Sequence, residues 1–150
     1  MHAARWIIGS ALAITVANVT GRTTGAAPAR GPIDACTLLT LDEVRAIVGA
    51  RVTIFAIGSN GPKTEGEVTV SNCTYTLSGQ DARGARVMLM WGPAATLVKT
   101  NEYYIKRNKE RSVIKGGVFV IASVTNANAQ GMVYEAAASE KLMAAALAKL

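Results

Sequence analysis

The chain of 150 residues is half hydrophobic, carries a formal net charge of +6, and contains two cysteines and one histidine. This length suits one domain, and the roughly 120 residues left after removal of an N-terminal signal are enough for one core. The only histidine is His2, in a segment that we expect to be removed. Histidine-based triads, general bases and metal sites are therefore excluded from the folded part.

Residues 1–29 have the pattern of an export signal. Met1-His2-Ala3-Ala4-Arg5 is short and basic, Trp6 to Val19 is mainly apolar, and Ala27-Pro28-Ala29 offers small residues before a cleavage point. A membrane-spanning helix needs roughly 18 apolar residues or more, and this run is shorter. We therefore expect cleavage, with no transmembrane helix left in the mature chain. Cleavage after Thr24-Gly25-Ala26 and retention as an uncleaved anchor are the alternatives.

The segment after the signal, residues 30–40, is expected to be a tether and helix cap, followed by a single domain over residues 41–150. Thr40 and Glu43 form a capping-box pattern, in which each side chain pairs with a backbone N–H of the first helical turn. The helix that follows ends at Gly49, where a left-handed backbone meets no Cβ clash. Its apolar residues recur at helical spacing, so one face must be buried against a later part of the chain.

Cys36 and Cys73 are expected to form one disulfide, because an exported chain matures in an oxidising compartment and two cysteines allow one pairing. Strand alternation over residues 67–77 places Cys73, Tyr75 and Leu77 on one face. That face is expected to point inward, toward the helix that follows Cys36. Two buried free thiols are the alternative.

The remaining elements are predicted from apolar periodicity and turn residues. The predicted strands are residues 51–57, 67–77, 85–91, 112–115 and 118–124, and the predicted later helices are residues 94–108 and a terminal helix from Val133 or Ser139 to Lys149. Residues 58–63 are predicted to be a loop, because they contain two glycines, an asparagine and a proline. Gly116-Gly117 is the clearest hairpin turn. The sequence thus predicts an α+β fold, with a mostly antiparallel sheet of about five strands and two to three packed helices.

Candidate binding residues gather in one basic region. Its cations, net of Glu102 and Glu110, account for the excess positive charge of the mature chain: Lys99, Lys106, Arg107, Lys109, Arg111 and Lys115. The default interpretation is a solvated helix end that leads into a strand. The alternative is a patch that binds lipid headgroups, wall polymers or an acidic partner. Nucleic acid is not expected as a partner of an exported protein. Trp91 and Tyr103 are candidate walls of a ligand pocket; for Trp91, core packing is the default interpretation and the pocket wall is the alternative.

No catalytic, cofactor-binding or metal-binding residue is predicted. A bridge between the two cysteines would leave no thiolate, and Gly116-Gly117 opens no helix, so it is not a phosphate-binding loop. Carboxylates such as Glu65 and Glu67 are explained as surface residues. A small hydrolase that uses paired carboxylates is the least favoured alternative.

The string Asp34-Ala35-Cys36-Thr37-Leu38-Leu39-Thr40 with Glu43-Val44 and Gly49, followed by Cys73-Thr74-Tyr75, resembles small exported bacterial proteins of unknown function. Many of these are actinobacterial cell-envelope proteins and lipoproteins. The resemblance implies an intramolecular disulfide and an α+β domain that is PsbP-like in outline, and it transfers no catalytic residue. This chain departs from the pattern, because it lacks a lipobox and carries Lys106 to Arg111 where members have a Gly-Asp-Ala-type segment.

We therefore expect an exported, periplasmic or secreted, non-enzymatic domain that binds a protein partner or a small ligand. The alternative binding function is that of a peripheral envelope-binding module, which would use the basic region of residues 99–115.

Overall fold

A computed structural model describes residues 31–49, 53–78, 83–108, 112–128 and 131–150. The predicted signal therefore lies outside the described residues. The elements are η1 (Ala35–Thr37), α1 (Leu41–Val48), β1 (Thr53–Glu65), β2 (Val68–Ser78), β3 (Arg83–Trp91), α2 (Ala94–Asn108), β4 (Ser112–Lys115), β5 (Val118–Asn128), β6 (Gly131–Tyr134) and α3 (Ala136–Lys149). All strand pairs are antiparallel, and the fold is α+β as predicted.

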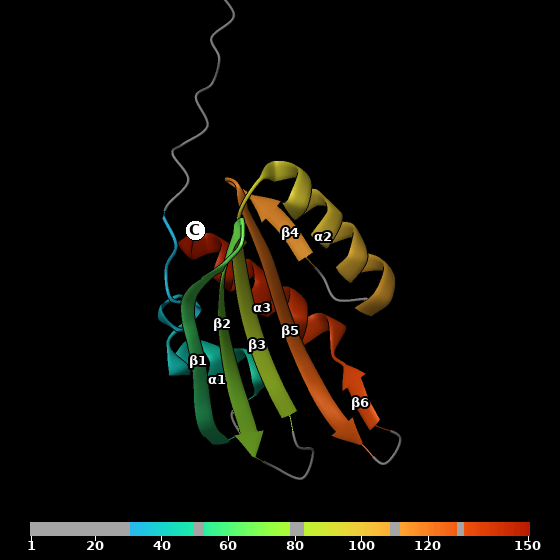
Figure 1. Ribbon diagram of the computed structural model, residues 1–150. Helices are drawn as coiled ribbons and strands as arrows, with labels where there is room; N and C mark the ends of the chain where they lie inside the picture. Colours follow the sequence, from blue (N-terminus) through green and yellow to red (C-terminus); the bar gives the residue numbers. More distant parts are fainter. Residues whose placement is uncertain (1–30, 50–52, 79–82, 109–111, 129–130) are drawn as a thin grey trace, which may run out of the picture.

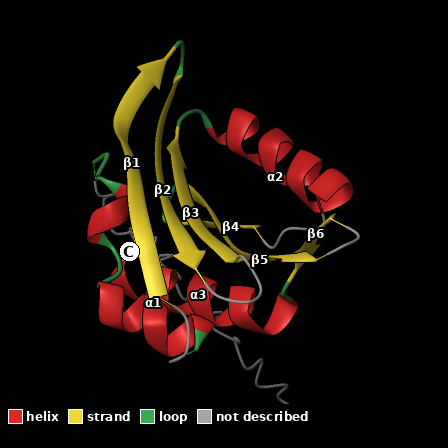
Figure 2. Cartoon of the chain, turned by 90° about the horizontal axis from the view of Figure 1, so that it is seen from below, coloured by secondary structure: helices red, strands yellow, loops and turns green. Residues whose placement is uncertain are grey.

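The strands form one sheet in the order β1-β2-β3-β5-β4, and β6 pairs with β5 beyond the end of β4 (Figure 1). The turn between β4 and β5 has positive φ at both Gly116 and Gly117, which is the backbone that the predicted hairpin requires. Figure 2 shows the layers: α1 and α3 lie on one side of the sheet, and α2 lies on the other. We call the side with α1 and α3 the first face and the side with α2 the second face.

The first face carries the main core. Alternate residues of β2, β3 and β5 point into it, as the pleat of a strand requires. Their buried side chains include Tyr75, Leu89 and Val120, and the helices contribute Val44 and Leu142. The alternating strand pattern thus gives a sheet whose first face is mainly apolar, as is usual for an antiparallel sheet with one face packed on the core.

Helix α3 is fixed to the sheet by a buried hydroxyl. Ser139 is fully buried, its Oγ accepts the backbone N–H of Val124 at 2.8 Å, and the same hydroxyl donates to the carbonyl of Glu135 at 2.6 Å. The hydroxyl of Ser139 thus links α3 to β5. It also pairs the backbone N–H of Val124, which would otherwise be a buried donor without a partner.

The capping box at the start of α1 is confirmed. The side chain of Thr40 accepts the backbone N–H of Glu43, and Glu43 Oε2 accepts the backbone N–H of Thr40 at 2.8 Å. Glu43 Oε1 also pairs with the ammonium of Lys149 at 3.0 Å, which joins α1 to the last residue of α3. These contacts hold the pKa of Glu43 below its ordinary value of 4.5, the Thr40 N–H most strongly and then Lys149.

This carboxylate makes stability depend on pH. Because the pKa of Glu43 is lower in the folded state, its stabilisation is complete above the ordinary value of 4.5 and is lost as the pH falls through the folded pKa. We expect Glu43→Gln to be less stable than the wild type at neutral pH, and the difference to disappear once the pH has fallen below the lowered pKa of the folded state. Urea unfolding of both proteins across this range measures it. An unchanged difference at low pH would contradict the assignment.

Three predictions of organisation were wrong. Residues 58–63 are not a loop, because β1 continues through them to Glu65 with register shifts that accommodate Gly61 and Pro62. A proline without an N–H is tolerated at such an irregularity on an edge strand. The segment of residues 30–40 is not only a tether, since Ala35, Leu38 and Leu39 are buried in the core. The sheet has six strands rather than about five, because β6 was not predicted.

Candidate functional site

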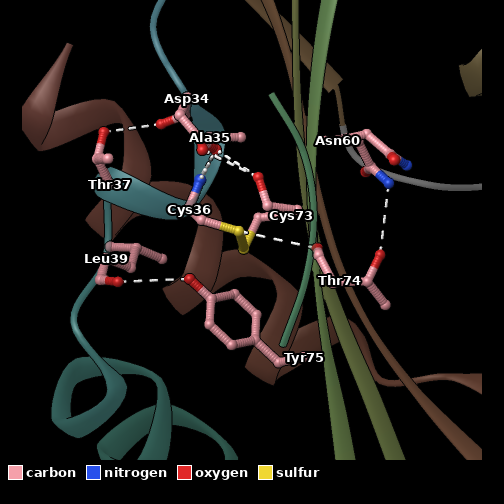
Figure 3. Close-up of a disulfide and its surroundings, with 12 residues drawn as sticks. Asp34, Ala35, Cys36, Thr37, Leu39, Asn60, Cys73, Thr74 and Tyr75 are labelled. Atoms are coloured by element: carbon pink, nitrogen blue, oxygen red, sulfur yellow. Dashed lines mark hydrogen bonds between the residues drawn. A yellow bond between two sulfur atoms is a disulfide. The ribbon is translucent and has the colours of Figure 1, made fainter. Parts of the chain in front are cut away.

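The predicted disulfide is present between Cys36 in η1 and Cys73 in β2, with their Cα atoms 4.9 Å apart (Figure 3). Hydrogen bonds fix η1 on the same strands. The N–H of Ala35 donates to Ser71 Oγ at 2.8 Å, and Ser59 Oγ donates to the carboxylate of Asp34 at 2.9 Å. The bridge is thus one part of a local network, and this end of the first face has a structural role.

Tyr75 completes that network. Its hydroxyl donates to the carbonyl of Leu39 at 3.4 Å, and its ring is buried beneath the segment that leads into α1 (Figure 3). Burial raises the pKa of Tyr75, with smaller contributions from the negative charges of Asp34 and Glu43. The hydroxyl therefore stays protonated and remains a donor over a wide pH range.

The polarity of the second face changes from one part of the sheet to another. Under α2 it is apolar, with Met88, Leu97, Phe119 and Ile121 buried together. Away from α2, the pleat places polar or small residues of neighbouring strands on this face: Ala56, Gly58, Asn60, Asn72, Thr74, Thr76, Gly84, Arg86, Ser123 and Thr125. Among the described helices, only α2 lies on this side (Figure 2). A partly polar surface of the sheet is therefore left without a helix over it.

A hollow lies at the border of these two regions, on the β1–β2 hairpin. It has a volume of about 360 Å³ and is lined by Asn60, Lys63, Glu65, Val70 and Asn72. The register pairs Asn60 with Asn72 and Lys63 with Val70, so these residues share the second face. The Lys63 ammonium and the Glu65 carboxylate form an exposed ion pair at 2.9 Å. The hollow therefore combines two amides, one ion pair and one apolar wall.

The amide of Asn72 is incompletely paired. Its Nδ2 donates to Thr74 Oγ1 at 3.4 Å, which is a long bond, while its Oδ1 is buried without a hydrogen-bond partner. Exchanging the oxygen and nitrogen of this amide would leave the nitrogen in the unpaired position instead. In either orientation the side chain keeps an unused polar atom at a position where a lost hydrogen bond costs about 1–3 kcal/mol.

Comparison with protein-family models, with curated proteins and with solved structures finds no match to this chain. Its site must therefore be judged from its own residues. No three metal-ligating side chains gather among the residues that the structure describes. Within the same residues, no helix is long and apolar enough to cross a membrane.

The structure describes three of the six predicted basic side chains. Lys99 and Lys106 are exposed on α2, whereas the ammonium of Lys115, at the end of β4, donates to the carbonyl of Leu147 in α3 at 2.6 Å. Arg107 lies in α2, but its side chain is outside what the structure describes, as are Lys109 and Arg111 altogether.

The two predicted wall residues lie apart. Trp91 is 9% exposed and belongs to the core of the first face, whereas Tyr103 is 52% exposed on α2. Neither lines the hollow. Sequence reasoning missed Asn60 because it lay in the predicted loop. The alternation predicted around Cys73 leaves Asn72 on the opposite face of its strand, but no local signal showed that its amide would lack a partner.

Proposed function

We propose that this chain is an exported, non-enzymatic domain that binds a partner or small ligand through the second face of its sheet. The observation that carries the proposal is the polar half of this face, over which no described helix lies. The apolar first face provides the main core of the fold. The polar side chains on the second face, which lie beside a hollow, are therefore available to bind a ligand.

Three further observations support the proposal. The signal pattern of residues 1–29 and the Cys36–Cys73 bridge both suit an oxidising compartment outside the cytoplasm. The bridge also consumes the two thiolates that nucleophilic or metal chemistry would need. The cysteine motifs resemble those of small exported bacterial proteins of unknown function, and this resemblance transfers no catalytic residue.

Export and the use of the second face are tested in the native cells. A photoreactive residue replaces Thr76, which is exposed on the second face, and in a matched control it replaces Lys141, which is exposed on α3. We expect the mature chain outside the cytoplasm, and an adduct of defined mass from position 76 but not from position 141. An uncut cytoplasmic chain would overturn export. The absence of a specific adduct at position 76 would overturn binding through this face.

A second candidate function rests on α2. Val98, Tyr103 and Ile105 are 49%, 52% and 52% exposed on this helix, beside the exposed Lys99 and Lys106. Apolar side chains next to cations suit peripheral binding to an anionic bilayer. Charge reversal at Lys106 and Arg107 should then abolish sedimentation with vesicles rich in anionic lipid. Unchanged sedimentation would end this alternative.

A further inference from the structure

We propose that the hollow lined by Asn60, Lys63, Glu65, Val70 and Asn72 is a site for an amide group, carried by a short peptide or by an N-acetylated sugar. This inference rests on the proposed function, because it assigns a ligand chemistry to part of the second face. The site is small: its volume of about 360 Å³ lies near the lower end of the range for small-molecule pockets.

The first argument is the unused polar atom of Asn72. A buried oxygen that accepts no hydrogen bond destabilises the folded chain. No described residue donates a hydrogen bond to Asn72 Oδ1. A ligand that supplies an N–H would remove this cost. Asn72, whose side-chain oxygen lacks such a donor, lines the hollow.

The second argument is the pairing of two amides. Asn60 and Asn72 lie directly opposite each other on β1 and β2, which brings their Cβ atoms to about 5 Å. An asparagine side chain carries an acceptor and two donor hydrogens on one planar group. A ligand amide has one N–H donor and one carbonyl acceptor, so it can donate to one asparagine and accept from the other.

The third argument concerns charge. Lys63 and Glu65 neutralise each other at 2.9 Å, and their side chains are 77% and 69% exposed. The rim therefore offers no net charge to a ligand, which favours a neutral group over a carboxylate or an ammonium. Val70 supplies an apolar surface for a methyl or methylene group next to the amide.

The unpaired oxygen is not exposed to solvent, so binding requires the Asn72 side chain to turn toward the hollow. The hydrogen bond that this rotation breaks is the 3.4 Å bond to Thr74, which is weak at that length. A well-aligned hydrogen bond from the ligand N–H would replace it. Binding should therefore be visible at the side-chain amide of Asn72 itself.

The experiment is a titration of the full mature chain, labelled with ¹⁵N, followed by NMR. The probes are N-acetylglucosamine, with glucose as the control that lacks the amide, and N-acetylglycine N-methylamide. We expect the side-chain NH₂ signals of Asn60 and Asn72 to shift with at least one amide probe at millimolar concentration, and not with glucose. The probe that shifts them identifies the source of the amide as a sugar or a peptide.

Variants make the test specific. Asn72→Val should weaken binding at least tenfold while the melting temperature stays the same or rises, because an unpaired polar atom is removed. Asn126→Val is the matched control: its Oδ1 is likewise buried and unpaired, but it does not line the hollow, and binding should be unchanged. Asn60→Ala, at an exposed position, gives a second loss-of-binding variant should Asn72→Val fold poorly.

Equal shifts with glucose, or unchanged affinity in Asn72→Val and in Asn60→Ala, would overturn the amide assignment. Silence of both asparagine signals with both amide probes would overturn it as well. The proposed function is judged separately by export and by crosslinking from position 76. If the amide probes do not bind but position 76 gives a specific adduct, only the assigned ligand chemistry is rejected and the proposed function is kept.

Discussion

Replacing Cys36 and Cys73 together with alanine is expected to lower the free energy of unfolding by about 4 kcal/mol. The bridge closes a loop with a sequence separation of 37 residues, and its loss frees that loop in the unfolded chain. Alanine is the suitable replacement, because Cys73 is fully buried and a serine hydroxyl there would add a second cost. Urea unfolding monitored by circular dichroism measures the loss.

The matched control for the disulfide prediction is the wild type under reducing conditions, which should be destabilised to a similar extent. The two proteins differ only by two sulfur atoms in the native state, whereas both lack the cross-link when unfolded. A double variant as stable as the oxidised wild type would show that the hydrogen bonds around η1 are sufficient to hold this segment.

Phe119→Ala is expected to cost about 3–5 kcal/mol, the largest effect of a single substitution in the second-face cluster. The ring is fully buried between the sheet and α2, and its centroid lies 5.9 Å from that of Tyr104. Removing it leaves a cavity that α2 can fill only by moving. Chemical denaturation gives the size of the loss, and hydrogen exchange of the α2 amides locates it.

The control for Phe119 is its partner in the register, Ile114 on β4, which is 37% exposed. Ile114→Ala should cost about 1 kcal/mol and leave exchange in α2 unchanged, because this side chain is not part of the buried cluster. Equal costs at the two positions would mean that α2 is held by its loops and not by the apolar contact.

Much of the fold could be predicted because its signals are local. The capping box at Thr40, the alternation around Cys73 and the Gly116-Gly117 turn each depend on a few neighbouring residues, and each is found in the structure. The disulfide followed from the number of cysteines. The α+β class followed from the combination of these elements.

The course of β1 could not be predicted, because it depends on a distant strand. Residues 58–63 have the composition of a loop, but pairing with residues 70–74 of β2 extends them into a strand. Tertiary pairing here overrides local preference, as it often does for strands. The hollow was missed for the same reason, since Asn60 and Asn72 meet only once this register is known.

The contact between α1 and α3 bears on the time at which the domain can form. Glu43 in the first helix pairs with Lys149 at the end of the last one, and the core of the first face includes Leu142, Met143 and Ala146 of α3. Because these partners are about a hundred residues apart, the core cannot close before α3 has been synthesised, and such distant contacts slow folding. The core of the first face is thus completed only when the C-terminal helix packs against it.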